Sequence, residues 1–157
     1  SHSSKGNRMT LPTDAQQLAE QVSAHMYAND AASQALGATI LSVEPGKARM
    51  GMTVRADMLN GHKTCHGGFI FALADSTFAF ACNSRNLPTV AAGCSIDYVA
   101  PAFEGDQLEA IATEYNLAGR TGVYDVEVLN QNGQRIAIFR GRSYRLRGAV
   151  VEESQSN

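Results

Sequence analysis

The chain lacks the features that mark several large classes of protein. Its 157 residues carry 13 Lys and Arg against 15 Asp and Glu, so the formal net charge is −2 and the isoelectric point lies near 6. This balance leaves no general basic patch and argues against nucleic acid as a partner. The sequence has no recognisable signal peptide and no apolar run long enough to span a membrane, so we expect no membrane association.

Cysteine is scarce as well. Cys65, Cys82 and Cys94 form an odd set with no paired spacing, and two of them lie in apolar surroundings. This pattern favours free thiols in a reducing compartment over a disulfide framework. We therefore expect a cytoplasmic protein.

The length is that of a single domain with enough chain to close a sizeable core. No repeat, linker or low-complexity segment divides the sequence. We expect residues 1–11 to be a disordered tail or an expression remnant, residues 12–148 to form the domain, and residues 149–157 to be a loose acidic tail.

The order of the expected elements predicts the fold class. Residues 12–30 have the spacing of a helix, and a glycine-containing loop at 59–67 leads into a longer helix that ends near Asn83. Strands are expected at 35–43, 47–54, 94–99, 107–117, 122–129 and 135–146, with a tight turn at Asn132-Gly133. Because four strands follow the long helix without intervening helices, we predict an α+β fold, an antiparallel sheet wrapped on one side around one buried helix.

One carboxylate stands in the middle of that apolar helix. From Gly68 to Cys82 the only polar side chains are Asp75, Ser76 and Thr77, and no Lys or Arg occurs between Lys63 and Arg85. The neighbours of Asp75 at helical spacing are Phe and Ala, which cannot pair with a charge. Burying an unpaired carboxylate costs several kcal/mol or raises its pKa, so Asp75 is a candidate functional group. The alternative is that it faces a water-filled gap or pairs with an Arg from elsewhere.

Further motifs surround this helix and carry a family resemblance. They are Asn60, the run Cys65-His66-Gly67-Gly68, Asp75, Gly119-Arg120-Thr121-Gly122 and Phe139-Arg140-Gly141-Arg142-Ser143. With the expected sheet and helix, this combination resembles a hotdog-fold acyl-CoA thioesterase of the PaaI type, the group associated with phenylacetate degradation. The resemblance covers roughly residues 29–147.

The resemblance implies a role for each matching residue. Gly67 corresponds to the glycine at the start of the helix whose N–H polarises the thioester carbonyl, Asp75 to the catalytic carboxylate, and Asn60 to a residue that places substrate or water. We also expect substrate contacts from His66 near the acyl group and from Gly68, Arg120, Thr121, Gly122, Arg140 and Arg142. Of the basic residues in the C-terminal half, most fit solvated strand faces balanced by acids, and one or two, such as Arg120, Arg140 or Arg142, could meet the CoA phosphates. Some related hydroxybenzoyl-CoA thioesterases carry a Thr one turn after the carboxylate, where this chain has Ala79. Their route for the attacking water therefore does not transfer unchanged.

The resemblance also implies an acyl-CoA substrate, of aromatic type, and a homodimer or a tetramer built from two dimers. Coenzyme A is part of the substrate, so no separate cofactor is expected. The chemistry suits these residues, because free N–H groups at a helix N-terminus stabilise the negative charge that develops on the carbonyl oxygen. The carboxylate is either the nucleophile, forming a mixed anhydride, or a base that activates water.

The spacing of the two central residues sets a geometric condition. Gly67 and Asp75 are eight residues apart, so on one helix they are separated by about 12 Å of rise. One thioester cannot touch both from the same helix. If both act in one site, a second chain must supply one of them, as two antiparallel helices in a symmetric dimer would do.

Other interpretations stay open at this stage. His62, Cys65 and His66 could bind a metal, although a closed site usually needs a fourth ligand, and Cys65 could act as a nucleophile. Asn60 precedes Gly61 and could be a plain turn residue. A hotdog hydratase or dehydratase and a non-catalytic acyl-CoA-sensing domain are the competing functions, although the His-Phe-Pro-Gly type segment of the dehydratases is absent.

Overall fold

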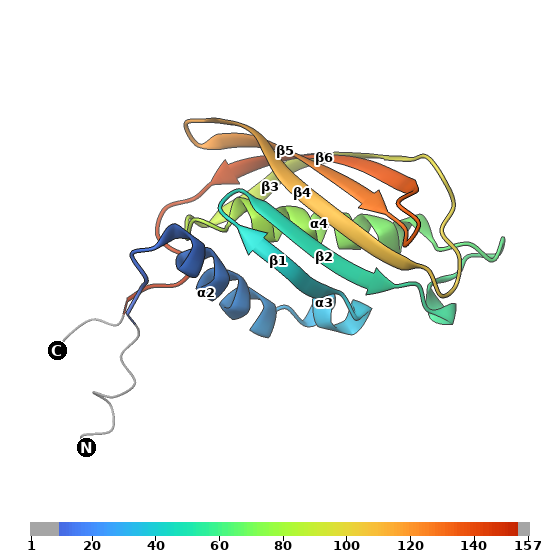
Figure 1. Cartoon of the computed structure of the whole chain (residues 1–157). Helices are drawn as coiled ribbons and strands as arrows, with labels where there is room; N and C mark the ends of the chain where they lie inside the picture. The colour runs from blue at the N-terminus through green and yellow to red at the C-terminus, as the bar shows by residue number, and fades with distance from the viewer. Residues whose placement is uncertain (1–9, 154–157) are drawn as a thin grey trace, which may run out of the picture.

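The computed structural model describes residues 10–153 as one antiparallel sheet with helices on one face (Figure 1). Positions 1–9, which hold most of the expected N-terminal tail, and positions 154–157 lie outside the described residues. The helices are α2 (Ala15–Ala28), α3 (Ala31–Leu36), the short 3-10 helix η1 (Ala56–Met58) and α4 (Gly67–Cys82). The strands are β1 (Thr39–Glu44), β2 (Lys47–Thr53), β3 (Thr89–Tyr98), β4 (Gln107–Ala118), β5 (Thr121–Leu129) and β6 (Arg135–Arg145), in the sheet order β1-β2-β4-β5-β6-β3.

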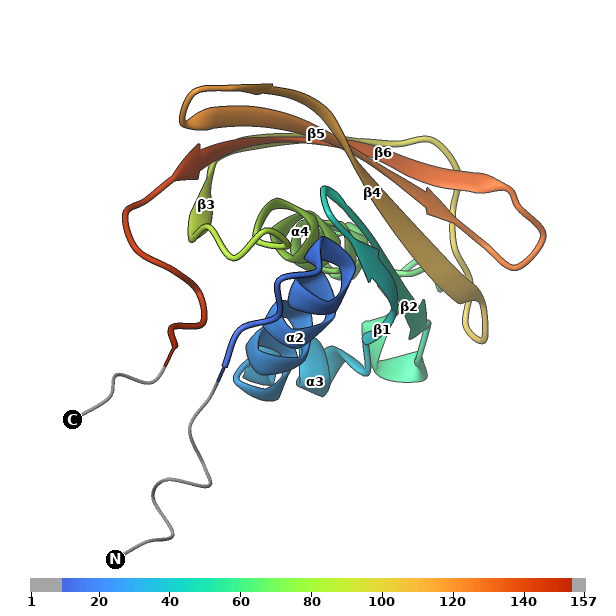
Figure 2. The ribbon, with the colours of Figure 1, turned by 60° about the vertical axis from the view of Figure 1, so that its left-hand side comes forward.

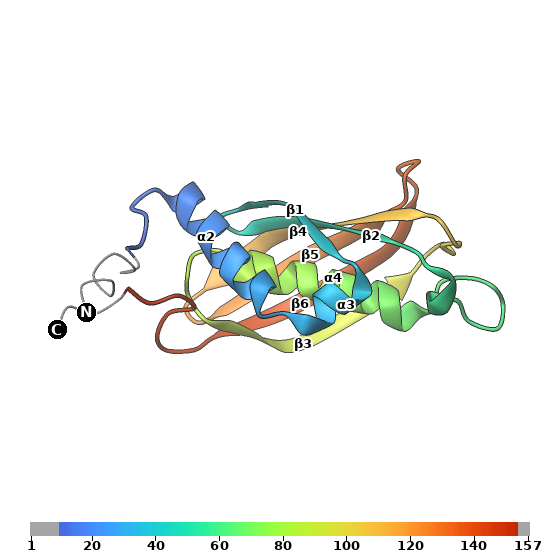
Figure 3. The same ribbon diagram turned by 90° about the horizontal axis from the view of Figure 1, so that it is seen from below.

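The sheet curls around α4, as Figure 2 shows, and α2 and α3 lie on the same side of the sheet (Figure 3). Phe78 on α4 packs against Tyr124 and Phe139 on the inner face, with ring centroids 5.6 and 5.9 Å apart. Gly141 on β6 makes this possible, because a Cβ there would lie 2.8 Å from the Phe78 ring. The predicted α+β class and the sheet wrapped around one apolar helix are confirmed.

The first predicted strand starts later than expected. Residues 35–43 were expected to be extended, but α3 continues to Leu36 and β1 begins at Thr39. The local cause is the cap at Asp30, whose carboxylate accepts hydrogen bonds from the N–H and the hydroxyl of Ser33. Gly37, with φ 71°, then ends the short helix in the left-handed region that glycine tolerates best.

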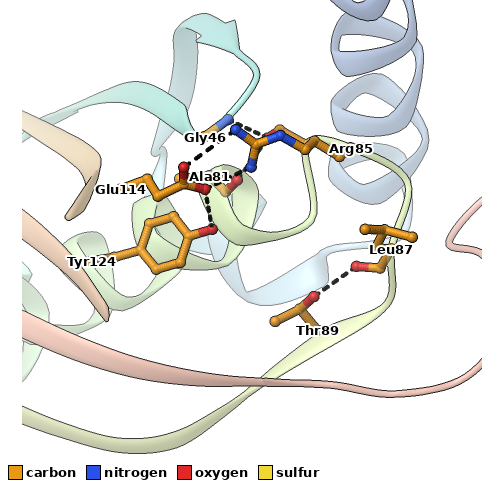
Figure 4. Close-up of polar contacts among 8 residues, drawn as sticks. Gly46, Ala81, Arg85, Leu87, Thr89, Glu114 and Tyr124 are labelled. Carbon is orange, nitrogen blue, oxygen red and sulfur yellow. Dashed lines mark hydrogen bonds and ion pairs between the residues drawn. The ribbon is translucent and has the colours of Figure 1, made fainter. Parts of the chain in front are cut away.

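The C-terminal end of α4 is tied to the sheet by a group of polar contacts (Figure 4). The Arg85 guanidinium donates to both oxygens of Glu114 on β4, at 2.6 and 3.3 Å, and the Tyr124 hydroxyl donates to the same carboxylate at 3.1 Å. The Ser84 hydroxyl donates to the Ala81 carbonyl and accepts from the N–H of Gly46 in the β1–β2 turn. These contacts join one helix end to two strands, β4 and β5, and to the β1–β2 turn.

The chain beyond β6 is also anchored. Val151 is 3% exposed, and its backbone N–H and C=O are both bonded to the Asn86 side chain, at 2.7 and 2.8 Å. The expectation of a loose tail from residue 149 therefore does not hold at Val151, while the expected domain bounds stay a prediction. Within the described part of the chain, none of the helices combines the length and the apolar character needed to cross a lipid bilayer.

Candidate active site

The N-terminal end of α4 carries one backbone donor without an acceptor. His66 is the N-cap, and its Nδ1 accepts the N–H of Gly68 at 2.9 Å while its carbonyl accepts the N–H of Phe69 at 3.0 Å. The N–H groups of Cys65 and His66 are bonded to the Ala102 and Met58 carbonyls. Among residues 10–153, nothing accepts the N–H of Gly67.

This free N–H has the properties of an anion-binding donor. The first N–H groups of a helix lack partners within the helix and lie at the positive end of its dipole. Because the His66 imidazole occupies the next donor, Gly68, only the Gly67 amide remains for a carbonyl oxygen that becomes negative. Nδ1 acts as an acceptor here, so neutral His66 carries its proton on Nε2.

A pocket of about 510 Å³ opens beside this donor. Its wall is mostly apolar and comes from the loop before α4, the first turn of α4 and the segment that follows β3. The lining residues are Thr64, Cys65, Gly67, Ile70, Tyr98, Val99, Ala100, Pro101 and Ala102. A group bound here would lie beside Gly67.

Asp75 lies on the same helix, half-buried and without a partner. No side chain or backbone group between residues 10 and 153 forms a hydrogen bond or ion pair with its carboxylate. Burial alone raises its pKa above the ordinary value, as predicted from the apolar sequence around it. The Asp75 charge in turn contributes to the raised pKa of Cys82 and of Cys94 on β3, which places it near both thiols.

Both groups lie on α4, which packs beside β3. Tyr98 on β3 contacts Gly67, and Cys94 on β3 lies within electrostatic reach of Asp75. Four strand residues span about 13 Å, close to the ~12 Å that separates the two helix positions. β3 is the last strand in the sheet order, so α4 runs beside a sheet edge that has no further strand among the described residues.

Asn60 has its side chain engaged within its own loop. Its Oδ1 accepts the N–H groups of His62 and Thr64 at 2.9 and 3.2 Å, and its Nδ2 donates to the Thr64 hydroxyl at 3.0 Å. Asn60 therefore shapes the turn that leads to Cys65 and the helix start, which is the turn-residue interpretation. A direct contact between Asn60 and substrate or water stays a prediction.

The alternative chemistries considered for this loop find no support in its geometry. Burial, with a smaller contribution from Asp106, raises the pKa of the Cys65 thiol to about 11, so the nucleophilic thiolate is scarce at neutral pH. Between residues 10 and 153, no three His, Cys, Asp or Glu side chains converge in a metal-binding arrangement. His62, Cys65 and His66 thus do not form a ligand group, and His66 serves as a helix cap.

The remaining predicted contacts lie away from the helix start. Arg120, Thr121 and Gly122 form the end of the β4–β5 hairpin, where Arg120 donates to the Arg145 carbonyl at 3.1 Å. Gly122 is a packing residue, because a Cβ there would lie 2.6 Å from the Ser143 hydroxyl. The structure therefore does not bring these three residues to the Gly67 donor within one chain.

Arg140 and Arg142 lie on the outer face of the sheet. Arg140 is held by Asp125 through two hydrogen bonds, at 2.7 and 3.0 Å, and stacks over the Tyr115 ring at 5.0 Å. Arg142 is exposed and has no acidic partner among the described residues. Of the two, only Arg142 has a guanidinium free to meet a phosphate.

Tyr98 is the residue at this site that was not singled out from the sequence. Its hydroxyl donates to the Gly67 carbonyl at 2.9 Å, and its ring lines the pocket. A signal existed, because Cys94, Ile96 and Tyr98 alternate along the strand and so share one face. What the sequence could not give was that this face meets the first turn of α4.

Comparison with known proteins places this geometry in a family. Residues 62–137 match the model of the thioesterase superfamily. The chain is 50% identical over 129 residues to the acyl-coenzyme A thioesterase PaaI of Escherichia coli K12, covering 82% of this chain and 92% of that protein.

Solved structures give the same result. The structure of the Escherichia coli PaaI protein from the phenylacetic acid degradation operon superposes with a TM-score of 0.85 at 48% identity, covering 87% of this chain and 99% of that one. A Streptococcus mutans protein solved with bound acetyl-CoA superposes with a TM-score of 0.67 at 28% identity, covering 69% of this chain and 88% of that one. The chain is thus a hotdog-fold acyl-CoA thioesterase and belongs to the PaaI group of the thioesterase superfamily.

Proposed function

We propose that the chain hydrolyses aryl-acyl-CoA thioesters, of the phenylacetyl or hydroxyphenylacetyl type, in a site shared by two copies of the chain. The Gly67 N–H of one copy binds the thioester carbonyl oxygen, and Asp75 of the other copy drives the attack. The observation that carries the proposal is the pair of unsatisfied groups on α4, one backbone donor and one carboxylate, too far apart to serve one thioester from the same helix.

The position of the two groups supports the shared site. Both lie along β3, a ten-residue edge strand whose only charged residue is Asp97 and which has no proline. The ladder between β3 and β6 shifts register once, between Ala91 and Gly93, and then runs regularly from Gly93 to Tyr98. Natural sheets usually protect an exposed edge with Lys, Pro or a bulge, and the regular part of β3 has none of these, so it is open to pairing with another strand. Two copies of β3 paired about a two-fold axis would bring the α4 helices side by side and antiparallel, with Gly67 of each facing Asp75 of the other. Two such dimers would form the proposed tetramer.

Two routes of hydrolysis remain compatible with this geometry. In one, the Asp75 carboxylate removes a proton from water, the water oxygen attacks the carbonyl carbon, the C–S bond breaks and the CoA thiolate takes up a proton. In the other, a carboxylate oxygen attacks directly, CoA leaves, and water then hydrolyses the mixed anhydride. Single turnover in water enriched in oxygen-18 separates them, because only the second route can place label in the Asp75 side chain.

The substrate class rests on the pocket and on the relatives. The wall beside Gly67 includes Ile70, Tyr98 and Ala102, an apolar surface that suits an aryl group. One relative comes from a phenylacetic acid degradation operon, and another binds acetyl-CoA.

We keep Arg120 and Arg142 as the proposed contacts of the CoA phosphates and assign Arg140 to the sheet surface. The three free thiols fit our proposal of a cytoplasmic enzyme.

Mixed dimers test the shared site. One chain carries Asp75→Asn. The other carries Gly67→Pro, which deletes the N–H, together with Tyr98→Ala, because a Cβ at residue 67 would otherwise lie 2.9 Å from the Tyr98 ring. Proline suits the first helical position, and His66 already has the extended ψ of 133° that a residue before proline needs.

Each homodimer should be nearly inactive, because every site lacks one of the two groups. In a mixed dimer one site joins the intact Gly67 of the first chain to the intact Asp75 of the second, so co-expression should restore one active site per dimer. Tyr98→Ala alone is the control for the added substitution. Verified mixed dimers that stay as inactive as folded parents would show that the two groups do not meet across the interface.

A further inference from the structure

Tyr98 makes two contacts with the first residue of α4. Its hydroxyl donates to the Gly67 carbonyl at 2.9 Å. Its ring also fills the space that a side chain at residue 67 would need, because a Cβ there would lie 2.9 Å from Cζ and 3.1 Å from Oη. A side chain at residue 67 would therefore displace the Tyr98 ring from its place against the first turn of α4.

The other contacts that hold the backbone at this point come from the first turn of the helix itself. Gly67 and Gly68 are consecutive glycines, the residue type with the greatest backbone freedom, at the end of a helix where fraying begins. Gly68 is fixed by the His66 imidazole, but nothing among residues 10–153 accepts the Gly67 N–H. The Gly67 N–H lies in the same peptide plane as the His66 carbonyl, which accepts the Phe69 N–H at 3.0 Å. On the other side of the Gly67 Cα, the Gly67 carbonyl accepts the Tyr98 hydroxyl, so Tyr98 is a second restraint on where that N–H points and the one that comes from another element.

We propose that Tyr98 is a positioning residue that holds the Gly67 N–H in the direction needed to bind the thioester carbonyl oxygen. This inference rests on the proposed role of Gly67 as the donor. A donor placed for an oxyanion helps in proportion to how well it is oriented before reaction, so loosening Gly67 should slow the chemical step more than it weakens substrate binding.

The environment of Tyr98 fits this role better than a purely structural one. Within one chain the side chain is 50% exposed, and the Gly67 carbonyl is the one group among residues 10–153 to which its hydroxyl is bonded. Its ring also lines the pocket beside the donor. Tyr27 offers a matched comparison, because its hydroxyl donates to the Ala38 carbonyl at 2.7 Å in a region formed by α2 and β1.

The test is Tyr98→Phe, which keeps the ring and removes only the hydroxyl. One lost hydrogen bond of ordinary strength predicts a fall in kcat of roughly five- to tenfold, with KM changed by less than about twofold because the pocket wall is intact. Tyr27→Phe should leave kcat unchanged. Parental kcat in Tyr98→Phe, or a loss in kcat no larger than that of Tyr27→Phe, would overturn the inference.

A double-mutant cycle adds a second readout. Gly67→Ala in the parent should lower kcat sharply, because the new Cβ displaces the Tyr98 ring and the backbone beneath it. In a Tyr98→Ala background the same substitution should cost much less, since the collision is gone. Additive effects would mean that Tyr98 does not control the Gly67 backbone.

Failure of this inference is distinguishable from failure of the proposed function. Two comparisons test the shared site itself: Asp75→Asn against the parent, and Gly67→Pro in the Tyr98→Ala background against Tyr98→Ala alone. If either variant keeps the activity of its reference, the shared site is wrong, and the proposed role of Tyr98 is wrong with it. If both of these variants are inactive while Tyr98→Phe and the double-mutant cycle show no effect, the shared site stands and the positioning role alone is refuted.

Discussion

The two ends of α4 treat their polar groups in opposite ways. At the C-terminal end, Arg85, Glu114 and Tyr124 satisfy one another, and Ser84 joins the helix to the Gly46 turn (Figure 4). At the N-terminal end, the Gly67 N–H has no acceptor among the described residues, and two turns further along the Asp75 carboxylate has no partner. One helix therefore carries a satisfied anchor and an unsatisfied site.

This difference separates stability from function within a single element. A buried or half-buried polar group without a partner costs free energy, so a fold that minimised only its own energy would pair or remove it. The C-terminal cluster shows that this chain can build such pairs around α4. That it leaves Gly67 and Asp75 unpaired supports a role for both groups in binding and reaction, with the cost to stability accepted.

The largest expected effect comes from removing the unpaired charge. Asp75→Asn keeps the side-chain shape, so turnover should fall at least ~100-fold, the scale of losing a catalytic acid or base. Because the substitution also relieves the burial of an unpaired charge, the variant should be as stable as the parent or more stable. Thiol release and thermal melts on the same preparation measure both.

The matched control is Asp125→Asn on the outer sheet face, which breaks the pair with Arg140 and should leave turnover close to the parental value. A folded Asp75→Asn enzyme with near-normal turnover would remove Asp75 from the mechanism and, with it, the contrast between the two helix ends.

Proton binding at Asp75 should appear in both activity and stability. The pKa of Asp75 is raised by burial above the ordinary ~3.9, and the ionised form is the active one, so the acid limb of kcat should have its midpoint above that value, with about tenfold loss per pH unit below it. The folded state favours the protonated form. The free energy of unfolding should therefore decline as pH rises from ~3.9 through the raised pKa.

Asp75→Asn should abolish this decline, and denaturant titrations of parent and variant across that pH range measure it. Stability curves that stay parallel throughout would mean that Asp75 ionises as easily in the folded state as in the unfolded chain.

A substitution at the C-terminal end of α4 should have the opposite effect to Asp75→Asn, lowering stability and leaving turnover intact. Glu114→Gln removes the charge that holds Arg85 and weakens the acceptor of the Tyr124 hydroxyl. The loss should be about 1–2 kcal/mol of unfolding free energy, towards the lower end because Arg85 is partly exposed. The kcat should stay near the parental value.

Asp57→Asn is the comparison for this cluster, since the Arg55–Asp57 pair is exposed and should contribute at most ~0.5 kcal/mol. Urea titration gives both values. If Glu114→Gln reduced kcat without reducing stability, the two ends of α4 would not divide as described.

The smallest expected effect concerns Arg120 and Arg142, the arginines proposed to contact the CoA phosphates. If Arg120 and Arg142 contact the CoA phosphates, KM for acyl-CoA should rise a few-fold between low and moderate salt while kcat changes less. An acyl-pantetheine substrate, which lacks the nucleotide, should show little of this dependence. Arg120→Gln should weaken the salt dependence of KM more than Arg140→Gln does. Equal salt sensitivity of KM for acyl-CoA and acyl-pantetheine would mean that these arginines do not contact the phosphates.

Much of the fold followed from local patterns in the sequence. The alternation of Met50 and Met52 predicted the buried face of β2, and the long, mostly apolar run predicted α4 to within a residue of its observed end. Where prediction failed, a local cap competed with an apolar pattern, as at Asp30 and Gly37. A contact distant in the sequence explains why Val151 is buried, because the Asn86 side chain, 65 positions earlier, is hydrogen-bonded to its backbone.

The sequence alone determined that Asp75 would be a carboxylate without a partner on its own helix, and that Gly67 lies too far along that helix to share one thioester with it. Both conclusions depend only on residue type and helical rise. Tertiary structure decided the rest. The Asn60 side chain is hydrogen-bonded within its own loop, and Arg140 is paired with Asp125. Tyr98 is hydrogen-bonded to Gly67, 31 positions away in the sequence. Contacts between elements depend on how the sheet curls around α4, and no local pattern encodes that curvature.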